Sequence, residues 1–151
     1  MLLLVRTLHI LAAIWFVGGV TGYIFTRLAM LRTENVAAVD ALVCMMARFR
    51  NLMLRIGGIL LVIFGLWTAY YESWPEFSRG AIVLLVILVP FMVLTARGSH
   101  KLEVVCAETV QAGSVTPVLR AAMRDRLLVA GEIGLGVITV LFLLLMLVKP
   151  S

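Results

Sequence analysis

The chain has 151 residues, of which 63% are hydrophobic and only 14% are charged, and its net charge is +5. A soluble domain is about half apolar and about a quarter charged, so this composition excludes an ordinary water-soluble fold and indicates an integral membrane protein. The positive charge then reports the membrane topology, and we expect no nucleic-acid partner.

Four apolar stretches are long enough, or nearly so, to cross a membrane. They lie at about residues 7–26, 52–71, 80–97 and 127–148. A helix needs about 20 residues to cross about 30 Å of hydrocarbon, and the third stretch comes close if Arg97 reaches up to the surface. The fold class expected for residues 1–151 is therefore a single all-α domain, an integral membrane four-helix bundle with helical extensions on the cytoplasmic side.

The first span carries a histidine among small and aromatic residues. At 100° per residue, the face of His9 also holds Ala12, Ala13, Phe16 and Gly19. Small residues beside an imidazole leave room for a flat group, so His9 is a candidate haem b ligand and its neighbours are candidate pocket residues. The alternative is a histidine that is hydrogen-bonded to a neighbouring helix or exposed at the interface.

The opposite face of the first span carries Gly18 and Gly22, a G-x-x-x-G pair. Small residues at this spacing let another helix approach closely, so the pair predicts helix packing. The second histidine, His100, follows the third span and lies across the membrane from His9. One protomer cannot place both on one iron, which leaves a haem held by His9 alone or with an axial methionine.

The connections at about 27–55 and 97–126 hold ten of the thirteen Lys and Arg residues. Because positively charged connections stay cytoplasmic, we expect both termini to lie outside, with the protein in a bacterial inner membrane. Apolar residues at helical spacing over 36–50 predict a helical extension there, and a helix lying on the membrane surface is the alternative.

The second connection contains its own helix signals. Thr116-Pro117 is typical of a helix start, with a hydroxyl cap followed by proline at the first helical position. Gly113-Ser114 predicts the break before it.

Arg55 and Glu132 are ionisable residues inside spans, where such groups are costly and mark functional candidates. Both lie toward the cytoplasmic side at similar depth, so we predict an intramembrane ion pair that fixes helix contact. Alternatively, Arg55 extends to the surface while Glu132 pairs with Arg126 or is protonated. A proton or substrate relay is the third interpretation.

The remaining chemistry-bearing residues give weaker indications. Cys44 and Cys106 fall in the cytoplasmic connections, where we expect reduced thiols. Cys44-Met45-Met46 offers soft ligands for Cu(I), although the methionines are more typical of packing, and we expect no metal site. No nucleotide-binding, hydrolase or catalytic-triad pattern is present, so we expect no catalytic residue.

The first span also carries a resemblance, in Leu8-His9, Ala12-Ala13, Trp15-Phe16 and Gly18-Gly19. It resembles the first helix of a bacterial family of predicted small integral membrane proteins of unknown function, itself similar to the membrane domain of copper-resistance D-type proteins. A more distant likeness is to the small four-helix, haem-containing protoporphyrinogen oxidases, with Tyr23 and Arg27 in similar surroundings. Their further histidines and their third-helix lysine are missing here. This likeness therefore implies only a haem-ligand role for His9.

Together these features predict a non-catalytic structural or accessory subunit of a membrane assembly, of a redox or transport kind. Its expected partners are the lipid bilayer, other membrane proteins or further copies of the chain. One alternative is a haem b protein with His9 as axial ligand. The other is a small transporter that uses Arg55 and Glu132.

Overall fold

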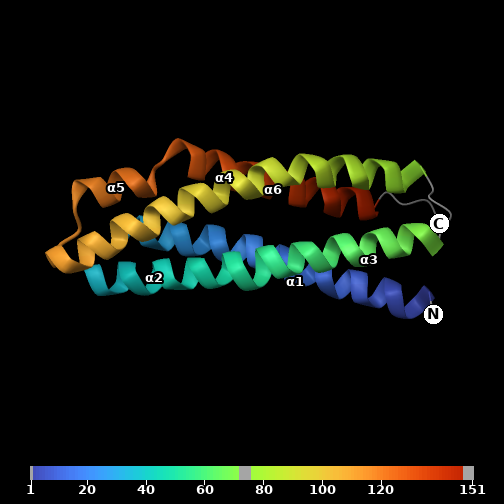
Figure 1. The fold of residues 1–151 in the computed structure, drawn as a ribbon, viewed down its shortest axis with the longest axis horizontal. Helices are drawn as coiled ribbons and strands as arrows, with labels where there is room; N and C mark the ends of the chain where they lie inside the picture. Colours follow the sequence, from blue (N-terminus) through green and yellow to red (C-terminus); the bar gives the residue numbers. More distant parts are fainter. Residues whose placement is uncertain (1, 72–75, 148–151) are drawn as a thin grey trace.

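The structure, a computed structural model, describes residues 2–71 and 76–147. It is an all-α bundle of long antiparallel rods, as predicted (Figure 1). The elements are α1 (Leu2–Met30), α2 (Val36–Arg48), the π-helix η1 (Phe49–Ile56), α3 (Gly57–Tyr71), α4 (Glu76–Ala112), α5 (Pro117–Met123) and α6 (Arg126–Leu147). α2, η1 and α3 follow one another without a break and form a single rod.

The rods are longer than a bilayer is thick. Among the residues described, four helices are long and apolar enough to cross a membrane: Leu2–Met30, Val36–Tyr71, Arg79–Ala112 and Pro117–Leu145. At 1.5 Å per residue they measure about 43–54 Å, against a hydrocarbon core of about 30 Å. Each rod therefore extends beyond the hydrocarbon, which confirms that the predicted connections are largely helical.

The bundle has two chemically different ends. α1 begins, α3 ends, α4 begins and α6 ends on one side, which we call the terminal end (Figure 1). We call the opposite side, which holds α2, α5 and the last part of α4, the polar end. The exposed charged residues of the predicted connections lie toward the polar end, among them Arg32, Arg48, Lys101, Arg120 and Arg124.

Local chemistry sets where the helices at the polar end begin. The Asn35 side chain accepts hydrogen bonds from the backbone N–H groups of Ala37 and Ala38, at 2.9 and 3.2 Å, and so caps α2. Thr116 caps α5 in the same way, with Pro117 at the first helical position, as predicted. Gly113 has a φ of 70°, which favours glycine, and confirms the predicted break after α4.

The extension at 36–50 packs into the bundle. Val39, Val43 and Met46 of α2 are buried against the neighbouring rods. The segment is continuous with η1 and α3, so the alternative of a helix lying flat on the membrane surface is wrong. The apolar residues at helical spacing therefore form the face of α2 that packs against the core near the polar end.

Candidate functional site

A cavity of about 380 Å³ lies near the terminal end, between α1, α3, α4 and α6. Three residues of the predicted pocket line it: His9, Ala13 and Phe16. The other two do not appear in its lining. Ala12 is buried in the core, and Gly19 is buried where α1 meets η1. Three of the five residues predicted to surround a ligand thus lie at one cavity, and their role in binding stays a prediction.

The walls of the cavity are mainly apolar, with a few polar groups. Arg6, His9, Thr68 and Thr139 are the polar side chains in its lining. The hydroxyls of Thr68 and Thr139 donate to backbone carbonyls one turn earlier in their own helices, at 2.8 and 2.7 Å. Arg6 and His9 are the ionisable side chains among these four, so they are the lining residues whose chemistry suits a charged or metal-containing ligand.

Gly65 of α3 makes room for the His9 ring. A Cβ atom at position 65 would lie 3.2 Å from Cε1 and 3.5 Å from Nδ1 of His9. That first distance is tighter than ordinary van der Waals contact, so any larger residue would push the imidazole aside. The position of His9 beside the cavity thus depends on a glycine in another helix, which spacing within the first span cannot reveal.

The predicted G-x-x-x-G packing is correct for one glycine and wrong for the other. Gly22 packs against the Phe49 ring, where an added Cβ would lie 2.6 Å from Cε1. Gly18 is exposed, and no other part of the described chain lies within 4 Å of where its Cβ would be. The second close approach is at Gly19, against Met53. The packing face is therefore rotated by one residue, because η1 crosses α1 along the Gly19–Gly22 side.

A second polar site lies toward the polar end, and its centre is a buried ion pair between Arg27 and Glu132. Glu132 is 3% exposed and Arg27 9%. A second nitrogen of Arg27, Nη1, donates to the backbone carbonyl of Met123 at 3.0 Å. Arg27 is thus held both by the carboxylate on α6 and by the end of α5.

The predicted pair of Arg55 and Glu132 is wrong. Arg55 is exposed on η1, and Glu132 pairs instead with Arg27 of α1. Similar depth was not sufficient for pairing, because the side chain of Arg55 is on the outer side of its rod. The alternative pairing with Arg126 is also wrong. A transport path through Arg55 and Glu132 has no support from this arrangement.

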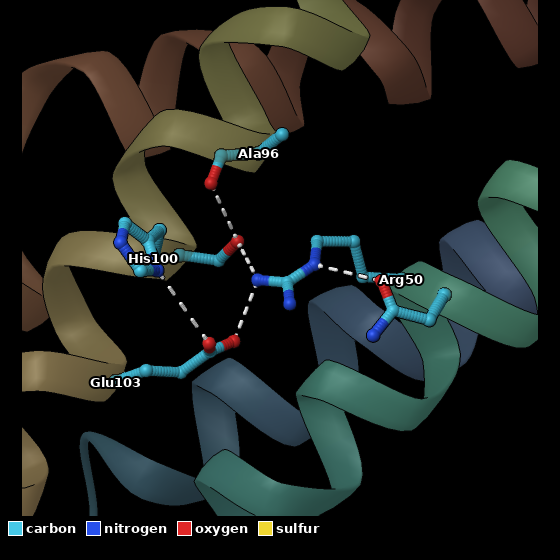
Figure 2. Close-up of polar contacts among 6 residues, drawn as sticks. Arg50, Ala96, His100 and Glu103 are labelled. Carbon is cyan, nitrogen blue, oxygen red and sulfur yellow. Dashed lines mark hydrogen bonds and ion pairs between the residues drawn. The ribbon is translucent and has the colours of Figure 1, made fainter.

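Arg50 joins the second rod to α4 close to the ion pair. Its Nη1 donates to Ser99 Oγ and to Glu103 Oε1, both at 2.6 Å. Figure 2 shows the guanidinium reaching from η1 toward α4, where His100 lies beside Glu103 on the side away from Arg50. π-Helical segments are frequent at functional sites, and this one carries Arg50.

Tyr23 lies close to members of both ion pairs. It is 1% exposed, with Ser99 beside its hydroxyl and Arg27, Arg50 and Glu132 close enough to act on it electrostatically. Neither that hydroxyl nor Oε1 of Glu132 has a hydrogen bond of good geometry with any residue that the structure describes. We call Tyr23, Arg27, Arg50, Ser99, Glu103 and Glu132 the buried polar cluster.

Sequence reasoning missed most of this cluster. A signal was available for two members, because Phe16, Tyr23 and Arg27 continue one buried stripe along α1. An arginine at the end of such a stripe faces the core and needs a buried anion, and Glu132 is the acidic residue deepest within a span. Ser99 and Glu103 have no comparable signal, because their roles depend on where Arg50 reaches.

The soft side chains of Cys44, Met45 and Met46 do not converge. Cys44 and Met45 are exposed, whereas Met46 is buried in the core. Residues 2–71 and 76–147 contain no group of three His, Cys, Asp or Glu side chains that could hold a metal ion. Cys44 and Cys106 are both free thiols.

Comparison with known proteins identifies the family to which the chain belongs. No curated protein and no solved structure matches the chain. The likeness to the copper-resistance proteins and to the haem-containing oxidases therefore stays a resemblance of the first helix. A family model described as "Predicted integral membrane protein (DUF2269)" matches residues 3–150. Because this match covers nearly the whole chain, the chain belongs to that family of predicted integral membrane proteins.

Proposed function

We propose that the protein is a non-catalytic membrane subunit that binds a flat, mostly apolar ligand in the His9 cavity. The cavity itself is the observation that carries the proposal. Its volume of about 380 Å³ lies within the range of about 300–1,000 Å³ that is typical of small-molecule sites. Apolar walls with a few polar groups are also typical of such sites. Membrane-protein partners, or further copies of the chain, remain a prediction from the sequence.

The polar residues of the cavity favour a ligand with an acidic edge. Arg6 is a permanent cation that suits a carboxylate, and His9 offers an imidazole that suits a metal or a hydrogen bond. Haem b is the first candidate because it combines an apolar ring, two acidic groups and an iron that accepts a histidine. His9 would hold the iron and Arg6 an acidic group. Bound haem would supply one-electron redox chemistry to an assembly.

An absorption spectrum of the purified protein tests the haem form of the proposal. We expect a Soret band after expression with added haem precursor, and a shifted or missing band in His9→Ala. His100→Ala serves as the matched control, since His100 is exposed near Glu103 at the other site and should leave the spectrum unchanged. The absence of a Soret band from the purified protein would exclude haem as the ligand. A band unchanged by His9→Ala excludes His9 as the ligand.

We further propose that the polar end faces the cytoplasm of a bacterial cell and that both termini face outward. The exposed Lys and Arg residues at the polar end support this, because such residues are retained on the cytoplasmic side. Cys44 is a natural probe, since it is exposed at the polar end while Cys106 is buried.

A membrane-impermeant maleimide should therefore label Cys44 only after the inner membrane is opened. Cys44→Ser should abolish this labelling. A cysteine introduced near the terminal end by Arg79→Cys should be labelled whether or not the inner membrane has been opened. Labelling of Cys44 in cells whose inner membrane is intact would reverse the orientation.

A further inference from the structure

We propose that Glu132 is a proton-binding site that exchanges protons with the polar end through Tyr23 and Ser99. This inference is independent of the ligand proposed for the cavity, because the buried polar cluster lies in the other half of the bundle. It assigns a second activity, reversible proton uptake, to residues that otherwise would only hold helices together.

Two buried polar atoms without hydrogen bonds are the starting observation. Arg27 uses only Oε2 of Glu132, and Oε1 is left without a partner among the described residues. The Tyr23 hydroxyl has the same deficit, and Glu132 acts on it electrostatically. Buried polar atoms nearly always have a partner, and those that lack one are the usual setting of an internal water molecule. Such a water would join the carboxylate of Glu132 to the hydroxyl of Tyr23.

The cluster continues from Tyr23 to the surface of the polar end. Ser99 lies beside the Tyr23 hydroxyl, and its own hydroxyl accepts a hydrogen bond from Arg50 and donates to the carbonyl of Ala96 at 3.1 Å. Arg50 also binds Glu103, whose side chain is 29% exposed and reaches solvent. The Ser99 hydroxyl and a carboxylate oxygen of Glu103 are both held on the same nitrogen of Arg50 (Figure 2), so the proton passes between these two oxygens while the guanidinium stays charged and keeps them in place.

Charged and polar groups from several elements surround this part of the bundle. α1 presents Arg27 and Tyr23 to Glu132, whereas Arg50 of η1 and Ser99 of α4 act on Tyr23. When a proton arrives, the carboxylate becomes a neutral acid and the cluster gains one positive charge. Arg27 then keeps its hydrogen bond to the Met123 carbonyl, so the guanidinium is not left wholly unsatisfied. The proton leaves by the same route, and no other bond is made or broken.

Infrared difference spectroscopy of the full chain in lipid nanodiscs, recorded after a jump to lower pH, tests this proposal. We expect a carboxylic-acid carbonyl band that appears reversibly and is lost in Glu132→Gln. Tyr23→Phe and Ser99→Ala should slow its appearance by about 100-fold, which is the low end of what a positioned proton-transfer group contributes. Thr109→Val is the control, because Thr109 is buried on α4 but lies outside both the cluster and the cavity lining. Its band should appear at the wild-type rate.

Two results would overturn the proposal. One is that no band from Glu132 appears at any pH at which the protein is folded, which would make the ion pair purely structural. The other is that the band appears equally fast in wild type, Tyr23→Phe and Ser99→Ala. If Glu132→Gln fails to fold, Glu132→Asp can assign the carbonyl band to residue 132. The band should shift in frequency in Glu132→Asp and should keep its frequency in Glu103→Gln.

Discussion

Gly19→Ala should destabilise the bundle, whereas the same change at the neighbouring Gly18 should not. A Cβ atom at position 19 would overlap the Cβ of Met53 and lie 3.3 Å from its carbonyl carbon and 3.4 Å from its Cα. Since backbone atoms are involved, no side-chain rotation can relieve the contact, and η1 must move away from α1. Overpacking of this kind costs about 1–3 kcal/mol, and the upper end applies here.

The intrinsic helix preference of alanine offsets part of this cost. Glycine is about 1 kcal/mol less favourable than alanine inside a helix, so the net effect of Gly19→Ala is a loss of about 2 kcal/mol. Gly18→Ala meets nothing within 4 Å in the described chain, and should gain up to about 1 kcal/mol. The two variants are therefore expected to differ by about 3 kcal/mol, although they add the same methyl group to adjacent residues.

Reversible unfolding in mixed detergent micelles, followed by tryptophan fluorescence, measures both variants against the wild type. The expected order of stability is Gly18→Ala, wild type, Gly19→Ala. Equal stability of the two variants would refute the packing of η1 on the Gly19 side. A less stable Gly18→Ala would instead favour the G-x-x-x-G face that the sequence predicts.

Two further predictions concern the polar end. At alkaline pH, Arg27→Met should cost about 3–5 kcal/mol because it leaves the Glu132 carboxylate buried without a cation, whereas Arg27→Met combined with Glu132→Leu should be close to neutral. The cost of the single variant should shrink as the pH falls, since a protonated Glu132 needs no cation; a double variant as unstable as the single one would contradict this. Asn35→Ala removes the two capping hydrogen bonds of α2 and should cost about 1 kcal/mol in the same unfolding assay, with an unchanged midpoint counting against the cap.

The fold could be predicted because its signals are local. Apolar runs of sufficient length identify membrane helices, and the cap at Thr116 and the left-handed Gly113 show where the last rod is interrupted. Helical spacing also identified the extension at 36–50. The π-helix had no comparable signal, because the chain passes from α2 through η1 into α3 without a break, and no side-chain cap marks where η1 begins.

The candidate sites could be predicted only in part, because they depend on contacts between helices. Three residues of the predicted His9 face line the cavity, since residues on one helix face follow from a fixed rotation per residue. The partner of Glu132 was not, because residue counting gives depth but not the direction in which Arg55 or Arg27 points. Glycine spacing has the same weakness: it shows that a close approach is possible without showing which side of α1 the neighbouring rod crosses.

Native mass spectrometry of the protein released from its own membrane tests the central claim, a ligand in the His9 cavity, without assuming that the ligand is haem. Gly65→Leu should crowd His9 and fill the cavity, while Gly18→Leu adds the same side chain to an open face. The account predicts a bound mass other than phospholipid on the wild type and on Gly18→Leu, and its loss from Gly65→Leu. A wild-type protein that carries no such mass, or a folded Gly65→Leu that keeps it, would contradict the account.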